Sequence, residues 1–366
     1  MKHIVIDGRE LRTTSGRYVE RLLYYLQIVD KSHTYTVLLK PTDMGGWQPV
    51  SSLFKKVACP YKEFTFGEQL GLKKQIEGLK PDLVHFPFPQ QPIRYNGPAI
   101  TTIHDLTTLR FNNPDKNFLM FKFKQRVYRH VMKKVVRKSE SVITGSHFVK
   151  EDIVRFGNIT PDKITVTYEA ADSIHEKPEP VLELDGQKFI MYIGRPTPHK
   201  NLERLIEAFR RIHPQQPDLL LVLAGKKDAN YERLEKKVRH QAIPNIVFTD
   251  YVSEGQLRWL YENCEAYVFP SLSEGFGLPG LEAMLHGAPV LSSNATCLPE
   301  IYGDAAQYFD PLNVQSIANA INNVLINERL RLDLIHKGRL QVAKYSWQTM
   351  AEQTLAVYKQ ALGEII

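Results

Sequence analysis

Short runs of apolar, largely β-branched residues recur along the chain, and stretches with helical spacing separate them. In the first half these runs are Ile4–Ile6, Tyr35–Leu39, Leu83–Phe86, Ile100–Ile103 and Ser141–Thr144. In the second half they are Phe189–Ile193, Leu219–Leu223, Ile246–Phe248, Ala266–Phe269 and Val290–Leu291. Each run is continuously apolar, which is typical of strands that helices cover on both faces, as in parallel sheets.

A polar, proline-bearing segment from Ser173 to Pro180 separates the two sets of runs and is typical of a linker. The chain has 366 residues, more than the roughly 250–300 at which a single core stops growing. We therefore predict an α/β fold with two Rossmann-like, doubly wound domains, residues 1–172 and 173–345. Residues 346–366 are expected to form a separate C-terminal helix whose apolar stripe contains Trp347, Met350, Leu355 and Tyr358.

The net charge of +7 is unevenly distributed. Through residue 175 there are 27 Lys and Arg against 17 Asp and Glu, whereas the remainder holds 20 against 23. A basic half and a mildly acidic half indicate different partners for the two domains. A positive domain suits nucleic acid, an anionic membrane or a phosphorylated substrate. Nucleic acid is not expected, because the sequence has no helix-turn-helix, zinc or RNA-binding signature.

Other bulk features favour a cytoplasmic protein. No uninterrupted apolar stretch is long enough to span a bilayer. The start of the chain, Met1–Asp7, meets a charge too early for a signal peptide and is typical of a first strand. Cys59, Cys264 and Cys297 are too few and too scattered for a disulfide framework or a metal knuckle, which fits a reducing compartment.

The most informative stretch is Ser273–Met284, which follows the apolar run that ends at Phe269. A strand, a glycine-rich turn and a helix are expected here in that order. Glycines let a ligand approach the backbone, and the N–H groups at a helix start attract anions. The turn contains three glycines between two acids: Gly275, Gly277 and Gly280, with Glu274 and Glu282. The alternative is an ordinary strand–helix turn with surface acids, but such a turn needs only one glycine.

A second glycine turn follows the run Phe189–Ile193. Gly194 and Arg195 come directly after it, and Lys200 precedes the next helical stretch. Arginine can fork two phosphate oxygens and lysine acts as a point charge, so the pair suits a diphosphate. Solvated surface cations are the alternative, which the position at the end of a strand disfavours. Gly225 ends the next strand with a similar turn.

Two weaker signals lie in the first half. His104 follows the run Ile100–Ile103, at a strand end where α/β proteins bind ligands, and its ring can donate a hydrogen bond. The alternative is that Asp105 only caps the following turn. The loop Thr13–Tyr18 contains Gly16 before a helix, and either an anion cradle or a plain helix cap explains it.

The basic bias comes mainly from residues 118–138, which contain no acid. Apolar side chains, including Phe121, Phe123 and Met132, lie between the cations, which predicts a basic amphipathic helix on an anionic membrane or an acidic acceptor. A solvated charged face is the alternative. The cations are Lys122, Lys124, Arg126, Arg129, Lys133, Lys134, Arg137 and Lys138.

Together these residues resemble the retaining glycosyltransferases of family 4, which have the GT-B fold and use nucleoside-diphosphate sugars. The segment from Glu274 to Glu282 matches the E-x7-E signature of that family. Further matching positions are Gly194-Arg195, Lys200-Asn201, Ala224-Gly225, Pro270-Ser271, Gly287-Val290 and Pro299-Glu300. The resemblance covers nearly the whole chain. It implies an N-terminal acceptor domain and a C-terminal donor domain that face a central cleft, with the last helix crossing back to the N-terminal domain.

The resemblance also implies a role for each candidate residue. Arg195 and Lys200 would bind the donor diphosphate, Glu274 would contact sugar hydroxyls, and His104 would lie over the donor sugar. The other donor-binding positions would be Gly16, Gly194, Gly225, Phe276, Gly277, Leu278 and Glu282, with Glu282 on the ribose. The loop around Gly16 is shorter than the usual Gly-x-Gly-Arg-Tyr form of the family.

We expect neither a metal nor another cofactor, because no Asp-x-Asp pair occurs in the chain. Arg195, Lys200 and helix N-termini would then supply the positive charge that a divalent ion provides elsewhere. The family's retention is attributed to front-face attack, in which the leaving phosphate helps to deprotonate the acceptor. For that reason no general base is nominated.

The sequence thus predicts a metal-independent, retaining hexosyltransferase. It would move a hexose from a UDP- or GDP-sugar to a lipid-linked or saccharide acceptor in cell-envelope or polysaccharide synthesis. The expected location is the cytoplasm, peripheral on the inner face of the plasma membrane. The alternatives are a non-catalytic sugar-nucleotide binding protein and a synthase or phosphorylase on the same scaffold.

Overall fold

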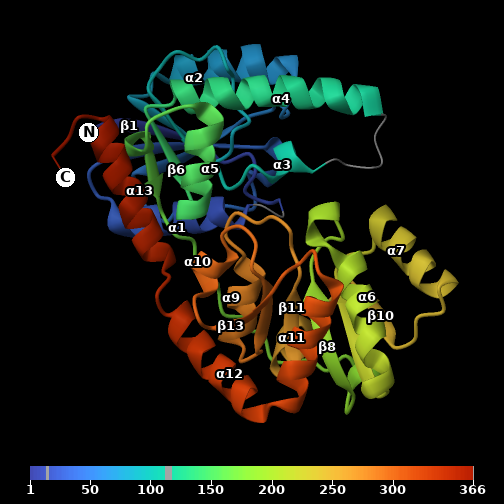
Figure 1. Ribbon diagram of the computed structural model, residues 1–366. Coiled ribbons are helices and arrows are strands. Elements are labelled where there is room, and N and C mark those ends of the chain that lie inside the picture. Colours follow the sequence, from blue (N-terminus) through green and yellow to red (C-terminus); the bar gives the residue numbers. More distant parts are fainter. Residues whose placement is uncertain (14–15, 112–117, 366) are drawn as a thin grey trace. The chain divides into compact units, whose positions relative to one another are not determined.

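The computed structural model describes residues 1–13, 16–111 and 118–365, and the chain divides into two compact units (Figure 1). The first unit comprises residues 1–109, 116–169 and 346–366, and the second comprises residues 110–115 and 170–345. Each is built on one parallel sheet. Among the described residues, no helix is both long and apolar enough to cross a membrane.

The first unit has a seven-stranded sheet in the order β3-β2-β1-β4-β5-β6-β7. Its strands are β1 (His3–Asp7), β2 (Thr34–Leu39), β3 (Phe54–Ala58), β4 (Leu83–Phe86), β5 (Ala99–Thr102), β6 (Ser141–Thr144) and β7 (Ile164–Val166). Its helices are α1 (Arg17–Val29), α2 (Lys73–Leu79), α3 (Thr107–Arg110), α4 (Phe118–Lys138), α5 (His147–Gly157) and α13 (Trp347–Ala361).

The second unit has a six-stranded sheet in the order β10-β9-β8-β11-β12-β13. Its strands are β8 (Lys188–Ile193), β9 (Leu219–Ala224), β10 (Ile246–Asp250), β11 (Ala266–Phe269), β12 (Val290–Ser293) and β13 (Ala306–Phe309). Its helices are α6 (Leu202–Ile212), α7 (Ala229–His240), α8 (Glu254–Asn263), α9 (Leu278–Leu285), α10 (Leu298–Tyr302), α11 (Val314–Ile326) and α12 (Glu328–Val342).

All ten strands predicted from the apolar runs are present, and two parallel α/β sheets confirm the predicted fold class. Three strands were missed, namely β3, β7 and β13. All three lie at a sheet edge, and their residues alternate or mix buried with partly exposed positions. An edge strand has one neighbour and less cover, so its sequence need not keep the continuous apolar run of a central strand, although the fourth edge strand, β10, does keep one.

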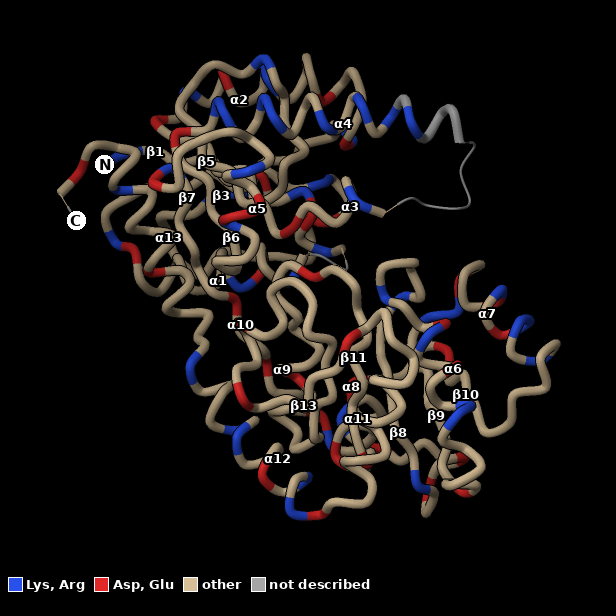
Figure 2. Tube along the Cα trace, viewed as in Figure 1, with Lys and Arg blue, Asp and Glu red and all other residues tan. Residues whose placement is uncertain are grey.

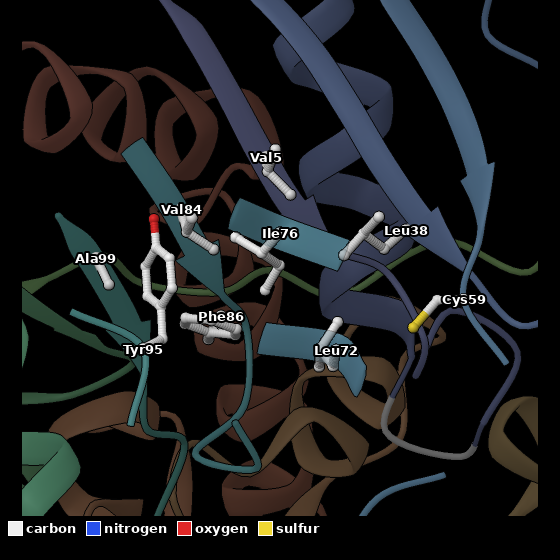
Figure 3. Packing of buried hydrophobic residues seen from close by; sticks show 9 residues of the cluster. All are labelled: Val5, Leu38, Cys59, Leu72, Ile76, Val84, Phe86, Tyr95 and Ala99. Carbon is white, nitrogen blue, oxygen red and sulfur yellow. The ribbon is translucent and has the colours of Figure 1, made fainter. Parts of the chain in front are cut away.

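The central strands carry the core of the first unit. Figure 3 shows Val5 of β1, Leu38 of β2 and Val84 of β4 in one cluster with Leu72 and Ile76, all completely buried. Leu72 and Ile76 come from the helical segment before and within α2, and their spacing of four residues places them on one helix face. The cluster therefore fixes α2 and the segment before it against the sheet.

In each sheet the first three strands in the sequence are added successively towards one edge. The chain then returns to the centre, and the later strands are added towards the other edge. In the second unit this reversal falls between the adjacent strands β8 and β11, and in the first it falls between β1 and β4. The loops that follow such a strand pair diverge, which leaves room for a ligand at the carboxyl ends of the strands.

The last helix, α13, belongs to the first unit, where it packs on α1. Tyr358 of α13 is completely buried, and its hydroxyl lies 2.6 Å from Nδ1 of His85 on β4. Nε2 of His85 lies 2.8 Å from the hydroxyl of Thr102, which is 3.1 Å from that of Tyr18. Burial and the nearby charge of His104 lower the pKa of His85 to about 3, so the imidazole in this buried row of hydrogen-bonded side chains is neutral.

Candidate functional site

An ion pair joins the ends of β8 and β11. Nζ of Lys200 lies 2.6 Å from Oε1 of Glu274, and both side chains are less than one-fifth exposed. Lys200 ends the turn that follows β8, and Glu274 lies in the turn that follows β11. The ammonium also lies 5.3 Å from the centre of the Phe269 ring, a cation–π contact. The structure therefore brings together two residues, 74 positions apart, that the sequence analysis chose separately.

Backbone contacts hold these two turns together. The Asn201 side-chain amide donates to the carbonyl oxygens of Pro270 and Pro311, at 3.0 and 2.8 Å. The Leu272 N–H donates to the His199 carbonyl at 2.7 Å. Asn201 has φ of +61°, in the left-handed region that asparagine tolerates better than most residues. The position of the ion pair is thus set by rigid neighbours.

The glycine turns after β8 and β9 touch each other. Gly194 and Gly225 have φ of +139° and +146°, and a Cβ atom on Gly225 would lie 2.6 Å from the Gly194 carbonyl oxygen. The buried Tyr231 hydroxyl donates to that same carbonyl at 2.7 Å. Arg195, in the first of these turns, is exposed and has no side-chain partner among the residues that the structure describes. It is a cation available to an incoming anion.

The turn before α9 packs on Tyr302. The buried Tyr302 hydroxyl donates to the Gly277 carbonyl at 2.5 Å, and Gly277 has φ of +97°. Cβ atoms on Gly277 and Gly280 would lie 2.5 and 2.3 Å from that hydroxyl. Both glycines therefore have a packing reason of their own, and their presence is not by itself evidence for a ligand.

The remaining residues of this turn are mostly buried. Phe276 is 5% exposed, and its ring packs edge-to-face on Tyr345, so only its backbone is placed to meet a ligand. Leu278 is the first residue of α9, where backbone N–H groups lack helical partners. Glu282 lies on α9 and is 9% exposed.

His104 lies in the first unit, directly after β5. Its Nδ1 is 2.9 Å from Oε1 of Glu169 and its Nε2 is 3.1 Å from the Pro87 carbonyl. Burial opposes the charged ring, but the hydrogen bond and charge of Glu169 outweigh it and hold the pKa of His104 above 6.5. Both ring nitrogens face acceptors, which favours the imidazolium. To donate to a sugar, His104 would have to exchange one of these two partners.

Gly16, the other first-unit candidate, is buried at the start of α1. A Cβ atom there would lie 2.2 Å from the Leu11 carbonyl oxygen and 2.3 Å from that of Glu10. No side chain fits at this position, so local packing alone requires glycine. Thr14 and Ser15 of the same predicted loop lie outside the described residues.

The predicted basic helix is α4, but much of its apolar side is not available to a membrane. Met132 and Val136 are completely buried and pack with Ile103, Val142 and other core residues. The side chains of Phe121 and Phe123 lie outside what the structure describes. Most of the predicted cations are exposed, namely Lys122, Lys124, Arg126, Arg129, Lys133, Lys134 and Arg137, while Lys138 is partly buried. Figure 2 shows Lys and Arg positions in blue along α4.

The second unit thus gathers most of the predicted donor-site residues at its strand ends: Gly194, Arg195, Lys200, Gly225, Glu274, Phe276, Gly277, Leu278 and Glu282. His104, Gly16 and the cations of α4 belong to the first unit. The sequence analysis missed Glu169 and Tyr302, because each acts through a partner distant in sequence. Among the described residues, no group of three His, Cys, Asp or Glu side chains is placed to hold a metal ion.

Replacing Gly280 by alanine should destabilise the second unit by about 1–3 kcal/mol, the usual cost of overpacking, because Tyr302 is fully enclosed and cannot move aside. The matched control is Gly78→Ala on α2, where a Cβ atom would meet nothing within 4 Å. That change should be neutral or stabilising, since alanine favours a helix. Urea unfolding of both variants measures the difference, and equal effects would contradict the packing role of Tyr302.

The ring of His104 should titrate above pH 6.5, and Glu169→Gln should lower that midpoint. A raised folded-state pKa means that the pair contributes fully to stability below pH 6.5 and that this contribution is lost as the pH rises through the raised value. NMR of ¹³C-labelled histidine rings measures the midpoint, and the signal missing from His104→Gln assigns it. A midpoint at or below 6.5 would show that Glu169 does not hold the charge.

Comparisons with known proteins identify the family of this chain. The sequence matches the family model described as Glycosyl transferases group 1 over residues 173–341 and that described as Glycosyltransferase Family 4 over residues 16–173. It is 33% identical over 278 residues to O-antigen chain mannosyltransferase B of Escherichia coli, covering 71% of this chain and 70% of that protein. O-antigen chain mannosyltransferase RfbU of Salmonella typhimurium is 29% identical over 252 residues, covering 69% and 66%.

Solved structures show the same fold at low sequence identity. Sucrose-phosphate synthase from Thermosynechococcus elongatus superposes with a TM-score of 0.78 at 18% identity, over 99% of this chain and 100% of that one. HepE from Anabaena, solved in complex with UDP-glucose, gives a TM-score of 0.74 at 16% identity, over 98% and 100%. On the two family models and the relative at 33% identity, the chain belongs to the group 1 glycosyl transferases, glycosyltransferase family 4 with the GT-B fold.

Proposed function

We propose that this glycosyltransferase moves a mannosyl or closely related hexosyl group from a nucleoside-diphosphate sugar to a cell-envelope polysaccharide acceptor. The transfer is retaining and needs no metal ion, and the acceptor is lipid-linked or saccharide. The two relatives described above are O-antigen mannosyltransferases, which supports mannose as the first sugar to test. The observation that carries the proposal is the Lys200–Glu274 pair at the point where the second sheet reverses direction.

The charges of this site suit a diphosphate leaving group. Breaking the bond between the anomeric carbon and the phosphate oxygen places negative charge on the diphosphate, and fixed cations stabilise that charge. Arg195 is exposed and has no side-chain partner among the described residues. Lys200 lies five residues further along the same loop, paired with Glu274. The N-terminus of α9 adds partial positive charge, with the Leu278 N–H as its first donor, since Pro279 has no N–H and the Gly280 N–H donates to the Gly277 carbonyl. Glu274 holds Lys200 in place and has carboxylate oxygens suited to sugar hydroxyls.

The acceptor side of the proposal rests on the first unit. The cations of α4 form a one-signed face that suits an anionic membrane surface. A lipid-linked acceptor would be presented at such a surface. We propose that the enzyme works as a peripheral protein on the cytoplasmic face of the plasma membrane.

Nucleotide release in the presence of membranes tests the activity, with UDP- and GDP-sugars as separate arms and GDP-mannose and UDP-glucose first. Lys200→Ala should lower turnover by roughly a hundredfold, the usual effect of losing one charge-stabilising group. Lys236→Ala, an exposed lysine of α7, is the matched control and should keep wild-type turnover. If none of the nucleotide sugars gives nucleotide release, the proposed enzyme activity is overturned. If Lys200→Ala keeps wild-type turnover, the proposed role of that lysine is overturned.

Vesicle binding tests the membrane surface. Four exposed α4 cations without a partner among the described residues can be changed to glutamine: Lys124, Arg126, Arg129 and Lys134. Each is worth about 1 kcal/mol at an anionic surface, so binding should weaken by on the order of several hundredfold while donor binding is kept.

The control for that experiment removes four exposed cations of the second unit in the same way: Lys188, Lys236, Arg329 and Arg339. The two variants have the same net charge, so co-sedimentation with phosphatidylglycerol vesicles separates the position of the charge from its amount. Equal binding by the two variants would contradict a dedicated basic face.

A further inference from the structure

The segment between β3 and α2 exposes three large apolar side chains. Phe64 is 68% exposed, Phe66 is 88% exposed and Leu70 is 62% exposed. Exposed apolar residues are common singly, but three within seven positions form a patch that usually marks an interaction surface. The segment is nevertheless anchored at both ends, because Cys59 and Leu72 are completely buried in the core cluster of the first unit (Figure 3).

A buried ion network holds Phe64 in a strained conformation. Phe64 has φ of +60°, which is unfavourable for a bulky side chain. Its N–H donates to Oε2 of Glu68 at 3.0 Å, and Oε1 of Glu68 accepts from Arg9 at 3.0 Å. Arg9 also binds Asp7 through Nε and Nη2, at 2.8 and 2.7 Å.

This network connects the exposed segment to the sheet. Arg9 and Glu68 are each only 2% exposed, and Asp7 is the last residue of the central strand β1. Backbone strain that the surrounding structure enforces is often found where a protein displays a functional side chain. Here the network fixes a segment whose apolar side chains point to solvent.

The side of this patch that faces α4 is basic. The Phe64 ring lies 6.5 Å from Tyr128 of α4, so the segment and the basic helix are neighbours. Burial and the charges of Lys134 and Lys73 lower the pKa of Lys138, so Lys73 of α2 lies near the cations of α4, although it is itself paired with Glu77 at 3.4 Å. Figure 2 shows Lys and Arg positions along both helices. Cations around exposed aromatic residues suit an anionic lipid surface, where the rings enter the interface and the charges meet the headgroups.

We propose that Phe64, Phe66 and Leu70 insert into an anionic bilayer while α4 and α2 bind its headgroups. This assignment rests on the proposed membrane-associated function and adds apolar contact to that of α4, where Met132 and Val136 are buried in the core and Val127 is 48% exposed. Insertion gives binding that salt weakens only in part, whereas purely electrostatic binding is lost at high salt.

The test compares Phe64→Ser/Phe66→Ser with wild type on phosphatidylglycerol–phosphatidylcholine vesicles in 0.5 M NaCl, a concentration chosen to screen surface charge. Removing two inserted rings should weaken binding by on the order of tenfold or more. Val50→Ser, an 84% exposed residue of the same unit, is the control and should bind as wild type does. Wild-type binding by the double variant would overturn the inference.

A dye at position 66 reports insertion directly. The three native cysteines are buried, so the thiol of Phe66→Cys is the one exposed to labelling by an environment-sensitive fluorophore. Its emission should shift to the blue when vesicles are added. Unchanged emission on bound vesicles would overturn insertion. Self-association of the wild-type protein that the double variant abolishes would also overturn insertion, because it would show that these residues form a protein–protein interface.

Phe64→Gly separates this role from a structural one. Glycine accepts φ of +60° without strain, so the melting temperature of the Phe64→Gly variant should equal or exceed that of wild type, while its vesicle binding should be weaker. A lower melting temperature would mean that Phe64 serves the fold. If wild type binds no vesicles at all, the proposed membrane function fails as well. If the glutamine variant of α4 loses vesicle binding and the Phe64 and Phe66 variants do not, the insertion proposal is wrong and the proposed membrane function stands.

Discussion

The ion pair between Lys200 and Glu274 is the contact around which the donor-side residues are arranged. It spans the two strand ends at which the second sheet reverses direction, and the Asn201 amide and the Leu272 N–H keep both turns in register. Each partner compensates the charge of the other in a partly buried place, where a lone charge would be costly. The pair is thus close to neutral in net charge, whereas the exposed Arg195 has no side-chain partner among the described residues. In the proposed transfer, the diphosphate would meet both Arg195 and the ammonium group of Lys200, which Glu274 holds in place.

The sequence was sufficient for the parts of the fold that depend on continuous burial. Central strands such as Ala266–Phe269 must be apolar on both faces, so their pattern is local and readable, and the strand ends then place Arg195, Lys200 and Glu274 at one edge. Edge strands such as β13 were missed because their burial is interrupted, since the two middle residues of β13 are only partly buried. The Glu169 partner of His104 and the Tyr302 support of the glycine turn depend on long-range packing, which no local pattern encodes.

Three residues changed meaning once their surroundings were known. The glycines at 277 and 280 were expected to make room for a ligand, yet each faces the hydroxyl of Tyr302. His104 was expected to donate to a sugar, yet both of its ring nitrogens already face acceptors within its own unit. In both cases the residue type was compatible with two demands, ligand binding and internal packing, and only the structure identifies the packing partner. A glycine or histidine at a strand end is therefore weaker evidence for binding than an ion pair that spans two turns.

The placement of α13 has a consequence for how the chain is made. The second unit is almost a continuous segment, residues 170–345, whereas the first is completed by residues 346–366. Tyr358 supplies the hydroxyl on Nδ1 of the buried His85, so that nitrogen gains this partner only after residues 346–366 have been synthesised. The unit that begins first during synthesis is thus finished last, and the second unit has its whole sheet available before then. An interruption of translation near the end would leave a complete second unit beside a first unit with an uncovered α1.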